Sequence, residues 1–142
     1  MFWGEFSHQL DKKGRLIIPA RYRQRLSTGA ILTRGIDHNL VVYPHGVWKS
    51  LSTQISEMSI ANPTARALRR LVFSGAIELT LDRQGRILIP NHLREYASLD
   101  GEALVIGMET FIEIWQPASW RETLMFVSET LAGSDTLLEL GL

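Results

Sequence analysis

Residues 10–19 read LDKKGRLIIP, and residues 81–90 read LDRQGRILIP. Both stretches contain Asp-x-x-Gly-Arg, followed by three aliphatic residues and a proline. The match continues downstream, where Arg23 corresponds to Arg94 and, after one inserted residue, Trp48 corresponds to Trp120. Chance does not readily produce agreement of this length in several registers. The chain therefore contains an internal duplication, and the duplicated unit decides the fold.

Each copy of the unit predicts the same order of elements: a strand, a tight turn, a short aliphatic strand, a helix and a strand pair. Gly14 and Gly85 suit the turn because glycine tolerates positive φ, and aspartate caps turns through its side chain. Proline then fits the first position of a helix. The expected ranges are strands 5–10 and 76–81, turns 11–14 and 82–85, strands 15–18 and 86–89, helices 19–26 and 90–97, and strand pairs ending at Tyr43 and Trp115.

Each half is close to the lower size limit for a core of its own, and the chain has no cysteine for a disulfide. We therefore expect an α+β fold in which the two halves interleave into one small barrel. Helices are expected at 47–58 and 62–74, and the C-terminal tail is expected to be helical at first and frayed at its end. The expected divisions are repeat 1 at 5–47, connecting helices at 48–75, repeat 2 at 76–119 and the helical tail at 120–142.

The charge of the chain is unevenly distributed, although its formal net charge is zero over 142 residues. Residues 1–94 contain 14 Lys and Arg against 6 Asp and Glu, a net charge of +8, whereas residues 95–142 contain 1 against 9, a net charge of −8. This polarity indicates one basic face and a separate acidic segment. The sequence shows no secretory signal and no membrane-spanning run, so we expect a soluble cytoplasmic protein.

The repeated turn brings a carboxylate close to a guanidinium, as Asp11 with Arg15 and as Asp82 with Arg86. Across a tight hairpin the carboxylate can bind the guanidinium bidentately and hold it rigid. A rigid guanidinium on a protruding loop suits guanine O6 and N7, or a phosphate. A single copy would be read more simply as a surface ion pair. Two copies with basic flanks favour DNA contact, in which Lys12, Lys13 and Arg83 would add phosphate contacts.

The sequence resembles the MraZ family over residues 1–120. The matching features occur in the family's order and spacing. They are Met1, Phe2 and Gly4; both Asp-x-x-Gly-Arg turns; Ile18-Pro19 and Ile89-Pro90; Val42-Tyr43-Pro44 with Trp48; Arg69-Arg70; Gly75-Ala76; and Ile112-Glu113-Ile114-Trp115.

This resemblance implies a DNA-binding transcriptional regulator built from two AbrB-like swapped-hairpin halves, which form a double-split β-α-β barrel. It also implies a ring-shaped homo-oligomer that binds short G-containing direct repeats in double-stranded DNA, upstream of the operon for cell division and cell-wall synthesis. We expect repression and nucleoid association, although the sequence does not separate repression from activation. The family's DNA-contacting Asp-x-x-x-Arg motif falls on Asp11/Arg15 and Asp82/Arg86. Copy two has Gln84 where copy one has Lys13, so the two turns can contribute unequally.

Three other interpretations are weaker. The four histidines, His8, His38, His45 and His92, show no metal-ligand spacing, and the chain has no Gly-rich phosphate loop. We expect no enzyme activity, metal, cofactor or small-molecule substrate. An AbrB-like antitoxin or protein-interaction module without specific DNA recognition is the main alternative. RNA binding is disfavoured because an aromatic stacking platform is missing, and the four tryptophans are expected in the core or an interface.

Overall fold

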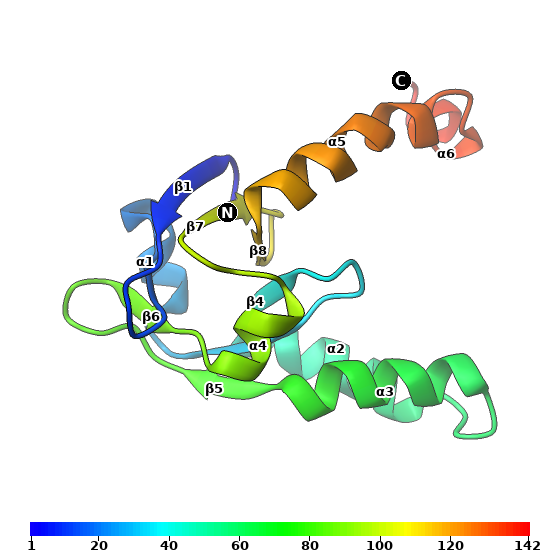
Figure 1. Cartoon of the computed structure of the whole chain (residues 1–142). Helices are drawn as coiled ribbons and strands as arrows, with labels where there is room; N and C mark the ends of the chain where they lie inside the picture. Colours follow the sequence, from blue (N-terminus) through cyan, green and yellow to red (C-terminus); the bar gives the residue numbers. More distant parts are fainter.

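The computed structural model describes residues 1–142 and contains eight strands and six helices (Figure 1). In chain order these are β1 (Glu5–Gln9), β2 (Arg15–Ile17), α1 (Ala20–Leu26), β3 (Ala30–Arg34), β4 (Leu40–Pro44), α2 (His45–Glu57), α3 (Pro63–Gly75), β5 (Ile77–Leu79), β6 (Arg86–Leu88), α4 (Asn91–Tyr96), β7 (Glu102–Gly107), β8 (Ile112–Trp115), α5 (Pro117–Leu131) and α6 (Asp135–Glu139). The α+β class and the order of elements within each repeat agree with the prediction.

The two repeats exchange strands in a six-stranded antiparallel sheet of order β1-β7-β8-β4-β3-β5. The first strand of repeat 1 pairs with repeat 2, so that Phe6 lies opposite Val105. The first strand of repeat 2 pairs with repeat 1, so that Glu78 lies opposite Ile31. The halves therefore interleave, as their small size predicted.

The closed barrel, by contrast, is not present. β1 and β5 form the two edges of the six-stranded sheet, and β2 and β6 form a separate two-stranded sheet. These two strands are only three residues long and are followed within two residues by Pro19 and Pro90, which lack an N–H group. They are too short to bridge the open edges. We call residues 15–17 and 86–88 the β2–β6 ribbon.

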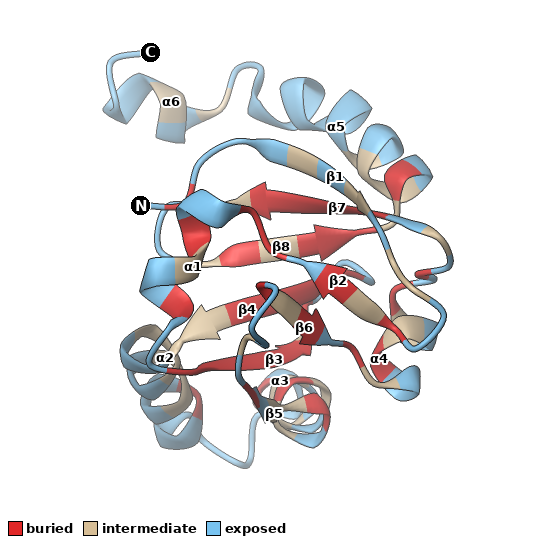
Figure 2. Cartoon of the chain, turned by 90° about the vertical axis from the view of Figure 1, so that its left-hand side faces the viewer, coloured by how far each residue is buried: buried red, intermediate tan, exposed pale blue.

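The main core lies between the β2–β6 ribbon and the six-stranded sheet (Figure 2). Leu16 and Ile87 point inward from the ribbon and are completely buried, where they join Val42 and Ile114 from the centre of the sheet. Because side chains alternate along a strand, the ribbon residues on either side of Leu16 and Ile87 face outward. The core thus fixes which face of the ribbon is exposed.

The other face of the sheet is covered by helices from the middle and the end of the chain. α2 and α3 pack against β3 and β4, while the start of α5 packs against β7, where Trp120 contacts Trp115. The rest of α5 and α6 projects from the body (Figure 1). The tail begins with a helix, as predicted, and continues into the short α6, which was not predicted and which Ser134 caps by accepting from the backbone N–H of Thr136. No helix combines the length and apolarity required to cross a membrane.

Candidate nucleic-acid interface

The first repeated turn is organised by the carboxylate of Asp11. Its Oδ1 accepts hydrogen bonds from the backbone N–H groups of Lys13 and Arg15, both at 2.9 Å. Its Oδ2 accepts from Nε of Arg15 at 2.7 Å. The predicted bidentate pair is therefore wrong in detail: one oxygen holds the backbone of the turn and the other holds the guanidinium. This arrangement orients Arg15 through Nε and leaves its Nη groups without a hydrogen bond in the chain.

The second turn repeats this geometry around Asp82. Oδ1 accepts from the backbone N–H groups of Gln84 and Arg86 at 2.9 Å, and Oδ2 accepts from Nε of Arg86 at 2.8 Å. The replacement of Lys13 by Gln84 leaves the turn unchanged because only the backbone N–H of that residue takes part. The charge at the turn differs between the copies, but the geometry does not.

The two arginines lie on one surface rather than on two separate tips. In the ribbon, Arg15 is opposite Leu88, and Ile17 is opposite Arg86. Arg15 and Arg86 therefore occupy diagonal positions on the same outer face. Nη1 of Arg86 also lies 3.7 Å from Oδ2 of Asp11, across the boundary between the repeats. The duplicated motif thus forms a single composite site.

The turn glycines are required for two reasons. Gly14 and Gly85 have φ of +84° and +76°, a region that other residues rarely adopt. Each also touches an arginine of the other repeat: a Cβ on Gly85 would lie 2.2 Å from Nε of Arg23, and one on Gly14 would lie 2.8 Å from Cζ of Arg94. This close approach was missed at the sequence level, although the repeat had already paired Arg23 with Arg94 as equivalents.

Backbone hydrogen bonds fasten each turn to the end of the opposite strand. The N–H of Ile18 donates to the carbonyl of Gly85, and the N–H of Ile89 donates to the carbonyl of Gly14, both at 2.9 Å. Nε of Arg23 donates to the carbonyl of Ile18 at 2.8 Å, whereas the buried Nε of Arg94 has no partner. The two ends of the ribbon are thus built alike in the backbone and differ in side-chain bonding.

Hydrogen bonding from the backbone N–H of Arg15 is the main cause that lowers the pKa of Asp11 to about 2, and the side chain of Arg15 contributes further. The backbone N–H of Arg86 likewise lowers the pKa of Asp82. Both carboxylates are therefore ionised near neutral pH, as a charge-assisted bond to arginine requires.

Positive charge surrounds the ribbon unequally. Lys12 and Lys13 are exposed at the first turn, and Arg83 is exposed at the second. The helix that follows the first copy adds Arg21 and Arg25, whose guanidinium carbons lie 5.9 and 5.2 Å from the ring centres of Phe6 and Phe2. The equivalent positions of the second copy are His92 and Tyr96. The first repeat therefore presents the more basic side.

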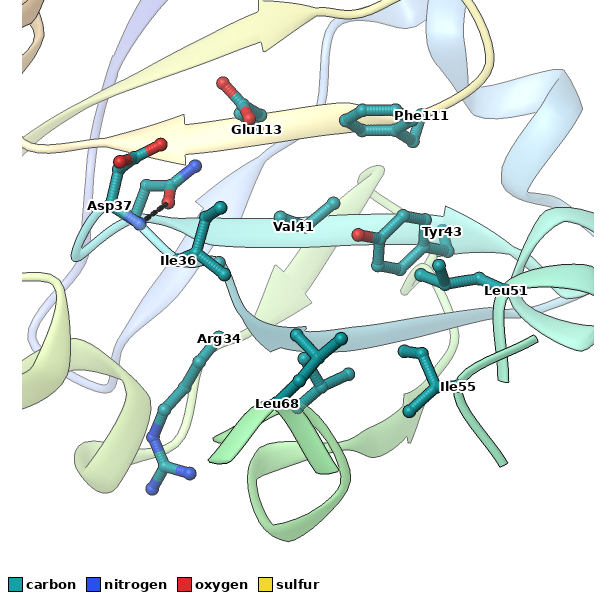
Figure 3. Close-up of a pocket in the computed structure, with 13 residues that line it drawn as sticks. Arg34, Ile36, Asp37, Val41, Tyr43, Leu51, Ile55, Leu68, Phe111 and Glu113 are labelled. Atoms are coloured by element: carbon teal, nitrogen blue, oxygen red, sulfur yellow. Dashed lines mark hydrogen bonds between the residues drawn. The ribbon is translucent and has the colours of Figure 1, made fainter. Parts of the chain in front are cut away.

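A cavity of about 180 Å³ lies on the far face of the sheet, between β4, β8 and the α2–α3 pair (Figure 3). Tyr43, Leu51 and Ile55 line its apolar part, and Glu113 stands at one end. Burial raises the pKa of Glu113. The cavity is smaller than the roughly 300 Å³ at which sites for organic ligands usually begin. No cluster of three metal-ligating side chains occurs in the chain, so the ribbon is the stronger candidate site.

A family profile described as "MraZ protein, putative antitoxin-like" matches residues 1–71 and again residues 72–134. The chain belongs to the MraZ family. A protein of Herpetosiphon aurantiacus named Transcriptional regulator MraZ is 51% identical over 124 residues, which cover 87% of each chain. A protein of the same name from Roseiflexus castenholzii is 49% identical over 124 residues, again 87% of each chain, and one from Desulfitobacterium hafniense is 45% identical over the full length of both.

The resemblance inferred from the sequence is therefore confirmed. The names of the MraZ relatives describe regulation of transcription and no catalytic activity, in agreement with the prediction that the chain is not an enzyme. The expectation of a core or interface position is met by Trp115, which is 2% exposed and lies in the core. Trp3 is 57% exposed in the single chain and donates its indole N–H to Glu109, so a core position is excluded for it and an interface position stays a prediction.

Proposed function

We propose that this chain is a sequence-specific DNA-binding transcriptional regulator of the MraZ type. The observation that carries the proposal is the position of Arg15 and Arg86 on one exposed face of the β2–β6 ribbon, each held by an aspartate of its own turn. A two-stranded ribbon fits the major groove of DNA, and arginine is the side chain that most often reads guanine there. The names of the relatives support the same function.

In this proposal Arg15 and Arg86 donate to O6 and N7 of guanine, while Asp11 and Asp82 orient them. Because each aspartate engages Nε of its own arginine, the Nη groups remain available for a base edge. A preorganised guanidinium loses less side-chain freedom on binding than a free one. The aspartates thus favour specific contacts without touching DNA.

Lys12, Lys13 and Arg83 contact phosphates from the two ends of the ribbon. The turns lie at opposite ends because the strands are antiparallel. Three-residue strands span roughly 10 Å, which is close to the roughly 12 Å width of the major groove. Lysines and arginines at both ends can therefore reach the two flanking backbones while the centre of the ribbon meets the bases.

One ribbon offers few contacts, so we propose that subunits assemble into a ring that presents several ribbons along one rim. Short G-containing direct repeats, upstream of an operon for cell division and cell-wall synthesis, would then be bound together, and avidity would strengthen weak single contacts. The net-neutral chain supports this reading because bulk charge attraction alone is small. We propose that such binding represses transcription and that the protein acts at the nucleoid, in the cytoplasm.

The same proposal divides the chain into two repeats at 5–47 and 76–119, connecting helices at 48–75 and a helical tail at 120–142.

The test is fluorescence anisotropy with DNA from just upstream of the protein's own gene, compared with a scrambled duplex. Arg15→Ala and Arg86→Ala are each expected to weaken specific binding by about 1–3 kcal/mol per site. Lys12→Ala is expected mainly to reduce the dependence of affinity on salt. Arg121→Ala, which changes an exposed arginine of α5, is the matched control. Unchanged binding by the Arg15→Ala, Arg86→Ala double variant refutes the assignment.

An antitoxin-like or protein-interaction module is the second candidate function. The family description contains the words antitoxin-like, and α5 exposes Met125 and Phe126, which are 72% and 54% accessible. Such patches are typical of protein contacts. This candidate predicts equal affinity for the upstream and scrambled duplexes, so the same titration separates the two functions.

A further inference from the structure

The outer face of the β2–β6 ribbon carries two aliphatic side chains beside its two arginines. Ile17 is opposite Arg86, and Leu88 is opposite Arg15. The four side chains form a diagonal array in which each strand presents one arginine and one aliphatic residue. Antiparallel pairing relates the two strands by a local twofold rotation, so the arginine–aliphatic pair occurs twice in opposite directions.

The chain covers these aliphatic residues only in part. Ile17 is 38% exposed and Leu88 is 55% exposed, whereas their inward neighbours Leu16 and Ile87 are fully buried. β-Branched Ile17 suits a strand, but the unbranched Leu88 has no such advantage. An apolar pair between two cations on an open surface is costly to leave in water. A surface with two arginines and two aliphatic side chains fits a partner that offers apolar groups beside hydrogen-bond acceptors.

The major groove of DNA offers that combination. Guanine presents O6 and N7 as acceptors, and the C5-methyl group of thymine is the apolar group on the base edges. We propose that Ile17 and Leu88 contact thymine methyl groups next to the guanines contacted by Arg15 and Arg86. Each β-strand of the ribbon then contacts one guanine and one neighbouring thymine of the DNA. This inference rests on the proposed function.

The test first selects bound duplexes from a random-sequence pool with the wild-type chain. Each thymine of the enriched sequence is then replaced by deoxyuridine, which removes only the methyl group. At the contacted positions, loss of the methyl group is expected to weaken binding about fourfold, the effect of exposing one buried methyl-sized group. Thymines elsewhere in the same duplex are expected to be insensitive.

Ile17→Ser and Leu88→Ser are each expected to lose the preference for thymine over deoxyuridine at one of the contacted positions and to keep it at the other. Leu88→Ala repeats the measurement with a milder change, because Leu88 is more than half exposed and contributes little to the core. Ile60→Ser is the matched control: Ile60 is 69% exposed in the turn between α2 and α3, away from the ribbon. This variant is expected to keep the methyl preference of the wild type.

The outcomes separate the two proposals. If no duplex is enriched, the proposed DNA-binding function fails, and this inference fails with it. If duplexes are enriched but deoxyuridine has no effect, or if the Leu88 variants keep the methyl preference at every position, only the thymine contact is overturned. A change in subunit number by light scattering in Ile17→Ser, with no methyl preference in the wild type, would assign these residues to contacts between copies instead.

Discussion

Nη1 of Arg86 lies 3.7 Å from Oδ2 of Asp11, so an arginine of the second repeat reaches the carboxylate that holds the arginine of the first. Asp11 therefore faces two guanidinium groups, whereas Asp82 is paired only with Arg86. The symmetry of the sequence repeat is broken at this point. The contact makes the two copies of the motif one electrostatic unit.

Asp11→Asn is accordingly expected to weaken specific DNA binding more than Asp82→Asn. Asparagine can still accept the backbone N–H bonds through Oδ1, but its amide cannot accept from a guanidinium. Asp11→Asn frees Arg15 and removes the second carboxylate beside Arg86, which Asp82 still holds through Nε. Asp82→Asn frees Nε of Arg86 but leaves both arginines near the carboxylate of Asp11. Anisotropy titrations measure the difference, with Asp37→Asn, an exposed aspartate between β3 and β4, as the control. Equal losses in the two variants would show that the contact between repeats has no role in binding.

Gly85→Ala is expected to destabilise the fold by more than Gly101→Ala. Both glycines have positive φ, at +76° and +85°, and this conformation costs alanine about 1–2 kcal/mol. Only Gly85 adds a clash, because its Cβ would lie 2.2 Å from Nε of Arg23, whereas the nearest neighbour of Gly101 is 3.8 Å away. Thermal denaturation compares the two variants. Gly46→Ala, in α2 with open space around it, serves as a control and should not destabilise. Similar melting temperatures for Gly85→Ala and Gly101→Ala would mean that the side chain of Arg23 moves aside without cost and that its contact with Gly85 adds nothing to stability.

The sequence predicts contacts within one copy of the repeat better than contacts between the two copies. The spacing of Asp11 and Arg15 was sufficient to predict their pair, because the turn itself brings them together. The partner of the Arg15 strand could not be predicted, since a three-residue aliphatic strand has the same pattern whether it pairs with β1 or β6. The open sheet has the same origin: its edge strands are set by pairings between residues 45 or more positions apart, such as Leu32 with Ile77, which no local pattern encodes. The contact between Arg86 and Asp11 follows from that pairing and was missed with it.

The pKa of Asp11 predicts when the first turn loses its anchor. Hydrogen bonds from the backbone N–H of Arg15 lower that pKa from 3.8 to about 2, so between these values the folded chain binds fewer protons than the unfolded chain. The stabilising contribution of the carboxylate is complete above about pH 4 and is lost as the pH falls through 2. A carboxyl NMR titration should therefore show Asp11 still ionised at pH 3. The loss of melting temperature in Asp11→Asn should be present at pH 5 and shrink toward pH 2. A titration midpoint near 3.8 would contradict the hydrogen-bonding pattern of the turn.

Glu113→Gln is expected to stabilise the fold at pH 7. Burial is the main cause that raises the pKa of Glu113, and the charge of Asp37 adds to it, while the indole N–H of Trp115 opposes it by donating to Oε1 at 3.0 Å. Glutamine keeps a carbonyl oxygen for that bond and removes the charge. The pKa of Glu113 in the folded chain is raised above the ordinary 4.5. The fold therefore loses stability as the pH rises above that value and Glu113 becomes charged in its buried position, whereas protonated Glu113 carries no such cost. The gain in melting temperature should therefore be seen at pH 7 and be absent at pH 4, and Glu122→Gln on the exposed side of α5 should give no gain at either pH. A gain of the same size at both pH values would mean that packing of the amide, rather than removal of a buried charge, stabilises the variant.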